Sequence, residues 1–414
     1  RIWQIPELKK KIIFTLTMLA VYRIGVFVTL PGVDRNAMNE FFTGGEAAGF
    51  LGLFNTFSGN AIKQLSVFAL GIMPYISASI VFQLLTVAIP TLDRLNKEGE
   101  QGRKKINQWT RYATIGLALF QGYFIATYLE SLGNKIVLEP GMSFRLMSVL
   151  TLTTGTAFIM WLGEQITERG IGNGMSLIIF AGIVSGLPSA LTEVLNLDQA
   201  TLLFLLAFVV GIILLIVFIE RAQYRIPIQY SKRMVGNVAS APQTSYLPLR
   251  INMAGVIPPI FASSLLMFPG TLSQWVNTGW FTSVTDALQQ GSWLYILVFS
   301  ALNIFFCYFY TSIVFNPTDT ADNMRKYGGF IPGIRAGKPT EDYLSYVLSR
   351  LTAPGSLYLG TISMIPLVAL VLIGASQNFP FGGTSILIMV GVALDTLKQI
   401  ESQLQQRNYE GFLR

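Results

Sequence analysis

The sequence predicts an all-α polytopic membrane protein, a fold class indicated by three observations. Hydrophobic residues make up 52% of the 414 residues, charged residues make up 12%, and the mean hydropathy is +0.52. The apolar residues fall into stretches of roughly 17 to 25, the length that crosses a hydrocarbon core of about 30 Å. Lys and Arg are concentrated in alternate loops between these stretches. This pattern is typical of a chain with many transmembrane helices.

Ten stretches have the length and composition of a transmembrane helix. They lie near residues 12–30, 65–89, 113–132, 146–163, 175–195, 201–219, 253–272, 293–315, 355–377 and 384–400. Alternate loops, starting with the N-terminal one, carry 24 of the 29 Lys and Arg residues, and the opposite loops carry three. Because basic loops stay in the cytoplasm, we expect both termini there. One missed or extra helix would mix the two sets of loops, so the asymmetry supports ten spans.

The spans divide evenly along the chain. Five precede the loop near residues 196–200 and five follow it, which gives an N-terminal half, 1–197, and a C-terminal half, 198–414. An odd number of spans in each half means that related halves must be inverted relative to each other in the membrane. The C-terminal half also holds two long basic loops, 220–250 and 316–350, which suit an acidic partner such as RNA or an acidic protein surface.

The segment 49–60, GFLGLFNTFSGN, is apolar but too short and too rich in glycine to cross the membrane. We expect a half-helix that enters from outside, because irregular backbone at membrane depth is tolerated only where protein or a water-filled cavity shields it. The alternative is an amphipathic loop on the outer surface. In the stretch that follows, Pro74 fits the first turn of a helix, so this helix is expected to begin inside the bilayer. Ile72 and Ile76 would then face the protein interior, as a hydrophobic constriction requires.

The predicted spans lack the groups that transport or catalysis would need. Asp and Glu lie at span ends or in loops, and the one ionisable residue well inside a span is Arg23, which we expect to be structural. Polar residues such as Gln83 and Asn303 are expected to hydrogen-bond between helices. A secondary transporter of a small solute, the alternative function, would need a polar or ion-binding site at the midplane. An intramembrane enzyme would need a carboxylate pair, a Ser-Lys dyad or a metal set at depth.

Other chemistry is excluded by composition. The chain has no histidine, a single cysteine, Cys307, and no phosphate-binding GxxxxGK[ST] loop. We therefore expect no metal, no cofactor and no enzymatic activity, and any work done with nucleotide must come from a partner.

Seven strings resemble those of the bacterial SecY family, and they occur in the same order between Trp3 and Arg414. They are ALGIMPYISASI, KEGEQGRKK, WLGEQITERGIGNG, NMAGVIPPIFASS, FNPTDTADN, FIPGIRAGKPT and FGGTS. The resemblance implies two pseudo-symmetric halves around a central hourglass pore in the bacterial inner membrane. Such a channel passes unfolded secretory polypeptides and releases transmembrane segments sideways into lipid. The implied partners are SecE, SecG, the SecA ATPase, the ribosome, polypeptides with signal sequences, and membrane lipids.

The resemblance also implies roles for individual residues at matching positions. The pore ring falls on Ile72, Ile76, Met175, Ile179, Ile260 and Ile388. The plug falls on Phe50, Leu51, Leu53, Phe54 and Phe57. The lateral gate falls near Ser77, Gln83, Asn252 and Phe268, and cytosolic partners dock on Arg225, Lys232, Arg233 and Arg335. Two features depart from the family pattern: Met175 replaces an isoleucine of the ring, and the loop tip 236–240 lacks a second basic pair.

Overall fold

The structure, a computed structural model, describes residues 5–43, 55, 58–132, 136–188, 192, 195, 199–230, 234–235, 238–239, 244–273, 283–285, 287–288, 292–373 and 383–411. Its helices are α1 (Pro6–Gly25), α2 (Arg35–Thr43), α4 (Met73–Ala88), α5 (Pro90–Lys97), α6 (Glu100–Ser131), α7 (Met142–Arg169), α8 (Gly174–Ser185), α10 (Gln199–Arg221), α11 (Ile257–Ser273), α13 (Trp293–Val314), α14 (Pro317–Lys326), α15 (Lys338–Ile373) and α16 (Gly383–Gly411). Its strands are β1 (Gln223–Tyr230), β2 (Met234–Val235), β3 (Val238–Ala239), β4 (Thr244–Arg250) and β5 (Gly329–Phe330).

Each of the ten predicted ranges overlaps one of these helices. By length and composition, four helical stretches in the described part of the chain could cross a membrane, or five if a broken helix counts as one span. The broken helix is α4 with α5, which bend by 101° at a short break. The bend falls at Pro90, the first residue of α5, because proline starts a helix readily but disfavours helical geometry in the residue before it.

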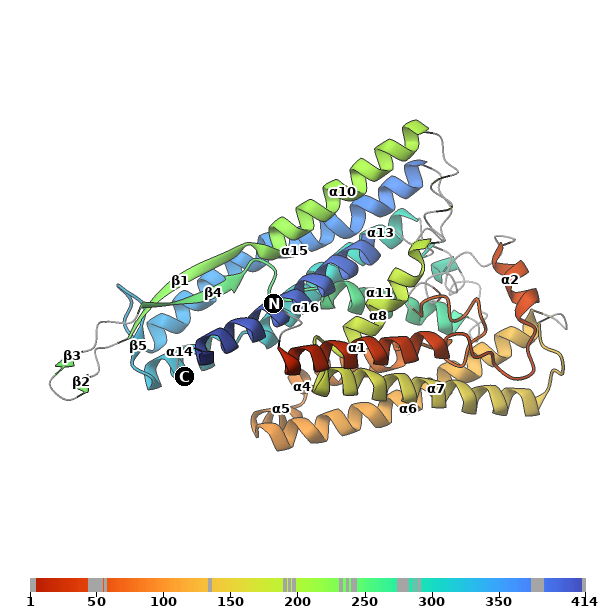
Figure 1. The fold of residues 1–414 in the computed structure, drawn as a ribbon, viewed down its shortest axis with the longest axis horizontal. Coiled ribbons are helices and arrows are strands. Elements are labelled where there is room, and N and C mark those ends of the chain that lie inside the picture. Colours follow the sequence, from red (N-terminus) through yellow and green to blue (C-terminus); the bar gives the residue numbers. More distant parts are fainter. Residues whose placement is uncertain are drawn as a thin grey trace.

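The helices of the two halves meet along a central contact zone. In Figure 1, α1, α4, α5, α6 and α7 lie below α10, α13 and α15. Contacts between the halves run from α4 to α11 and from α8 to α16. The largest hydrophobic cluster of buried residues lies in this zone and takes members from both halves. The core of the protein therefore coincides with the boundary between the halves.

A non-helical stretch, residues 58–72, runs through this core. Its backbone is bound to the chain at the end of α1: the Leu30 N–H donates to the Leu65 carbonyl at 2.7 Å, and the Val67 N–H donates to the Val28 carbonyl at 2.9 Å. The Ser66 hydroxyl donates to the Gly25 carbonyl at 3.1 Å. These bonds satisfy polar groups that a helix would otherwise satisfy internally, and so permit irregular backbone at this depth.

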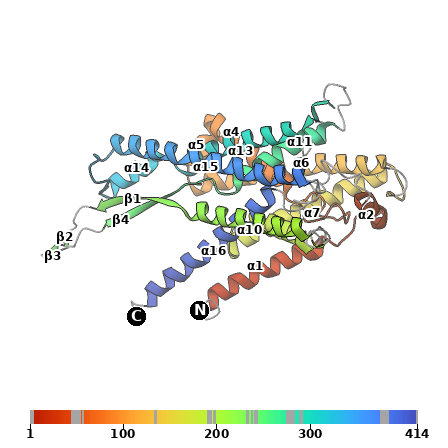
Figure 2. The same cartoon turned by 90° about the horizontal axis from the view of Figure 1, so that it is seen from above.

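The all-α prediction is wrong for the two long basic loops, which form a three-stranded sheet in the order β4-β1-β5. β1 pairs antiparallel with β4 from Gln223↔Arg250 to Gln229↔Thr244, and with β5 at Gln229↔Phe330. Alternation explains β1: Ile226 and Ile228 are buried on one face, and they pack on residues of α14 and α15. Both views show the β1–β4 hairpin projecting beyond the helices, with β2 and β3 at its far end (Figures 1 and 2).

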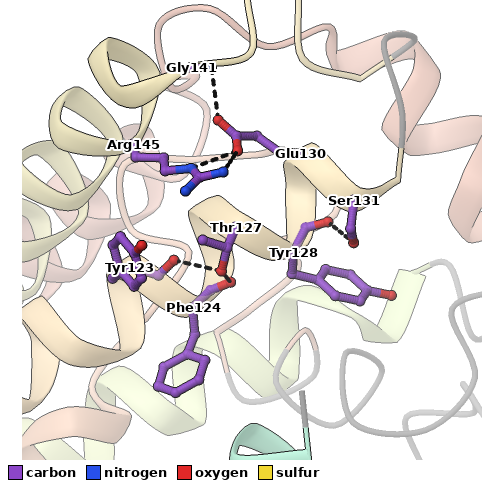
Figure 3. A network of polar contacts seen from close by, with 8 residues as sticks. All are labelled: Tyr123, Phe124, Thr127, Tyr128, Glu130, Ser131, Gly141 and Arg145. Carbon is purple, nitrogen blue, oxygen red and sulfur yellow. Dashed lines mark hydrogen bonds and ion pairs between the residues drawn. The ribbon is translucent and has the colours of Figure 1, made fainter. Parts of the chain in front are cut away.

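The α6–α7 hairpin is the closest helix pair of the N-terminal half, and an ion pair fixes its turn. Figure 3 shows the Glu130 carboxylate reaching from α6 to Arg145 on α7, where Nη2 lies 2.6 Å from Oε2. The other carboxylate oxygen accepts from the Gly141 N–H at 3.0 Å. One carboxylate therefore ties the end of α6 both to the start of α7 and to the residue before it.

Candidate functional site

The six residues that the resemblance assigns to a pore ring come from four helices, and their side chains belong to the largest buried cluster or pack against it. Ile72 is the N-cap residue of α4, and Ile76 lies within α4. The others are Met175 and Ile179 of α8, Ile260 of α11 and Ile388 of α16. The five isoleucines are each no more than 5% exposed and belong to the largest buried cluster, against which Met175 packs. The four helices are connected as neighbours, since α11 contacts α4 and α16, and α16 contacts α8. We call these six side chains the apolar ring.

Each ring residue lies at the N-cap of its helix or within its first six residues. Pro74 stands in the first turn of α4. Three residues earlier, Gly71 has a φ of +57°, which suits glycine and lets the chain turn into the helix. Asn173 caps α8, because its side-chain oxygen accepts from the N–H groups of Met175 at 3.1 Å and Ser176 at 3.5 Å. The starting points of these helices therefore decide where the ring side chains meet.

A cavity of about 490 Å³ adjoins the ring on the side of the basic loops. Four ring residues line it: Ile76, Met175, Ile179 and Ile260. The rest of its lining is more polar and includes the ion pair between Arg111 of α6 and Glu164 of α7, with Nε 2.6 Å from Oε1. A polar vestibule that ends at an apolar ring can hold water and a hydrated chain, while the empty ring excludes water and ions.

A second cavity, of about 980 Å³, lies between α4, α5 and α6 on one side and α13 and α14 on the other. It shares Ser79, Gln83, Asn107 and Tyr310 with the first cavity. Its lining includes side chains of both charges, among them Asp93, Lys97, Arg103 and Asp319. The two cavities together follow the boundary between the halves on the side of the basic loops.

The predicted gate residues fall in different places. Ser77 and Gln83 are half-buried on α4, and the Gln83 oxygen Oε1 is buried without a hydrogen-bond partner in the described structure. Phe268 is in α11, but its side chain lies outside the described residues. Asn252 precedes α11 and donates to Glu220 Oε1 at 2.6 Å, so this hydrogen bond goes to α10 and not to α4.

The α4–α11 contact uses two residues that were not predicted for the gate, Met73 and Ser264. The Ser264 hydroxyl lies 3.6 Å from the Met73 sulfur and also donates to the Ile260 carbonyl at 2.9 Å. A thioether is a weak acceptor, so this contact holds the helices together only weakly. In the sequence, the small residues Ala262 to Ser264 could have indicated this contact, because small side chains let helices approach closely.

The predicted docking residues that are described lie on or next to the projecting sheet. Arg225 is exposed on β1. Arg335 is exposed five residues after β5, and its carbonyl accepts from the Thr340 hydroxyl at 2.9 Å. Arg225 therefore lies on the sheet, and Arg335 lies in the chain that follows the sheet's strand β5. Lys232 and Arg233 lie outside the described residues, as do all five predicted plug residues, Phe50, Leu51, Leu53, Phe54 and Phe57.

No group of three or more Cys, Asp or Glu residues that could hold a metal occurs in the part of the chain that the structure describes. The site is therefore made of apolar side chains, two polar cavities and a basic projection.

Comparison with known proteins identifies the family. The family model described as SecY matches residues 66–397. The chain belongs to the SecY family. A protein translocase subunit SecY from Streptomyces galbus is 52% identical over 435 residues, which cover 100% of this chain and 99% of that protein. A multi-pass membrane protein is thereby established, and its membership of the SecY family supports a protein channel. The alternative of a small-solute transporter is not favoured.

Two solved structures share the SecY fold. One, reported as that of a protein conducting channel, is 18% identical with a TM-score of 0.66 and covers 95% of this chain and 92% of that one. The other, Sec61 in the canine ribosome-channel complex from the endoplasmic reticulum, is 17% identical with a TM-score of 0.63 and the same coverage. At these identities the likeness shows the fold.

The Asn173 cap provides a test of how the ring is positioned. Asn173→Ala removes the acceptor for two N–H groups at the start of α8, and we expect a loss of stability of about 1 kcal/mol. Thermal unfolding of the purified protein in detergent measures it. Asn173→Ser, which keeps a capping oxygen, serves as the control and should unfold near the wild-type temperature. If both variants unfold at the wild-type temperature, the cap does not fix α8.

Proposed function

We propose that this chain forms the channel of a bacterial protein translocase, in which unfolded secretory polypeptides pass through the apolar ring. The observation that supports it most directly is the ring itself, six apolar side chains from both halves at the end of a polar vestibule. A pore that admits any side chain cannot rely on matched polar groups. An apolar ring binds no substrate specifically, yet it excludes ions and water from a narrow empty pore.

The proposed topology is ten spans in the inner membrane with both termini in the cytoplasm. The two halves, 1–197 and 198–414, would be inverted repeats around the pore. The overlap of each predicted span with a helix supports this arrangement, as does the bias of Lys and Arg toward one set of loops. The plug would be formed by the segment 49–60, which adds a second barrier next to the ring.

Lateral release would occur between α4 and α11. Their described polar contact is the weak one between Ser264 and Met73, so separating the helices breaks little more than apolar packing. An apolar segment in the pore could replace that packing. It would then gain about 0.3 to 0.6 kcal/mol for each Leu-like residue at mid-span by entering lipid.

The driving energy would come from partners, because the channel itself would hydrolyse nothing. We propose SecE and SecG as further subunits, and the SecA ATPase or the ribosome as the cytosolic motor. The exposed Arg225 on β1 and the exposed Arg335 in the chain after β5 support docking of an acidic surface. Sec61, which shares the fold, is found in a ribosome-channel complex.

Replacing one ring residue tests the seal. Ile388→Ala shortens a fully buried ring side chain, and we expect the resting ion conductance of the assembled channel in a planar bilayer to rise several-fold. The control is Ile386→Ala, which removes the same atoms from the same helix in a separate buried cluster. Equal conductance in the two variants and the wild type would contradict the ring assignment.

Reversing one charge tests the docking surface. Arg335→Glu places a negative charge where an acidic partner would bind, so SecA-driven transport into vesicles should slow while the amount of assembled channel stays constant. Lys338→Glu makes the same change at an exposed position three residues along the chain. Similar slowing in both variants would indicate a general effect of net charge, and reduced assembly of the Arg335 variant would make that residue structural.

A further inference from the structure

Arg23, the ionisable residue inside a predicted span, binds the start of the non-helical stretch 58–72. Its Nη1 donates to the Gly59 carbonyl at 2.8 Å, and its guanidinium carbon lies 5.2 Å from the centre of the Phe27 ring. The preceding residue, Tyr22, is 1% exposed, and its hydroxyl donates to the Ser58 carbonyl at 3.1 Å. Adjacent side chains of α1 therefore hold adjacent carbonyls of one turn.

The turn at Ser58 and Gly59 needs such partners because its backbone is not helical. Gly59 and Asn60 have φ values of +67° and +66°, in the left-handed region that a continuing right-handed helix excludes. Asn55 closes the turn, since its carbonyl accepts from the Asn60 N–H at 2.8 Å and its side-chain oxygen accepts from the Lys63 N–H at 2.9 Å. The carbonyls of Ser58 and Gly59 are then free to accept bonds from α1.

The same turn touches both elements that begin the ring in the N-terminal half. A Cβ on Gly59 would lie 2.7 Å from the Gly182 Cα, so the turn packs directly on the backbone of α8, one turn beyond Ile179. On its other side, Ser58 contacts Gly71, the neighbour of Ile72. A displacement of the turn would therefore be felt by ring residues on α4 and α8 together.

We infer that Tyr22 and Arg23 are positioning residues that lock this turn against α8 and α4, and so hold the ring in its closed arrangement. The inference rests on the proposed channel function. Each acts through the carbonyl that it binds. The two hydrogen bonds hold the turn against Gly182 of α8 and Gly71 before α4, so their loss would free the ring residues on both elements to separate.

Variants that remove one donor at a time test the inference. Tyr22→Phe deletes only the hydroxyl, and Arg23→Met keeps the apolar stem but removes the guanidinium. We expect each to raise the open probability of the resting channel in planar bilayers by about tenfold, equivalent to about 1.4 kcal/mol. We also expect each to allow transport of a secretory protein with a defective signal sequence. Arg23→Lys, which keeps a charged donor, should restore part of the closed behaviour.

Two matched controls separate positioning from general destabilisation. Tyr358→Phe removes the hydroxyl of another buried tyrosine, one with no hydrogen-bond partner in the described structure. Arg145→Met removes an arginine from an ion pair at the α6–α7 turn, away from the ring (Figure 3). Both controls should keep the wild-type open probability and signal-sequence dependence.

The outcomes distinguish the inference from the function beneath it. If the Tyr22 and Arg23 variants stay closed while Ile388→Ala leaks, the positioning role is wrong and the channel function stands. If Ile388→Ala does not leak either, the proposed seal itself fails. If the two controls open as readily as the Tyr22 and Arg23 variants, the effect is general destabilisation and the positioning role is again wrong.

Discussion

Irregular backbone inside an apolar core has to be satisfied by the protein around it, and residues 58–72 impose this requirement on the N-terminal half. The end of α1 supplies partners for Leu65, Ser66 and Val67. Gly155 of α7 leaves room for the Val67 carbonyl, which a Cβ there would overlap. Because the stretch is not helical, α4 begins at Met73 in mid-core, and its first turn points into the centre of the molecule.

In both halves the position of the ring depends on where the backbone becomes helical. Its side chains come from the N-cap or the first six residues of α4, α8, α11 and α16, so the residue at which each helix begins decides where they lie. Apolar contact is non-directional, and a ring built from it can separate and close again without finding matched partners. Directional bonds occur around the ring and not in it: the Asn173 cap, the Arg111–Glu164 pair and the α1 bonds to the 58–59 turn.

The sequence predicted the features that follow from hydropathy and backbone chemistry. The ten apolar stretches coincide with helices, and Pro74 marks the start of α4 as expected. Hydropathy failed where helices are polar: α6 begins at Glu100 and α15 at Lys338, well before their apolar parts. The sheet was missed because β1 and β4 are short, and each contains a proline, Pro227 and Pro248, which argues against a strand.

The sequence indicated some residues of the site but not the hydrogen bonds that surround them, for a physical reason. Matching positions indicated the ring residues, and five of them lie in the largest buried cluster with Met175 packed against it. Hydrogen bonds between distant segments leave no periodic signal in the sequence. The bonds from Asn252 to Glu220 and from Tyr22 to the Ser58 carbonyl could therefore not be predicted. The weak contact between Met73 and Ser264 likewise depends on how α4 and α11 meet.

The central claim is that one apolar ring, shared by both halves, surrounds the passing polypeptide. Photo-crosslinking of a secretory chain stalled in the assembled channel tests it most directly, with a photoreactive amino acid placed singly at Ile76 or at Ile388. The account predicts crosslinks to the stalled chain from both positions and none from Leu214, a residue of α10 that is 65% exposed. Crosslinks from only one ring position, or equally from Leu214, would contradict it.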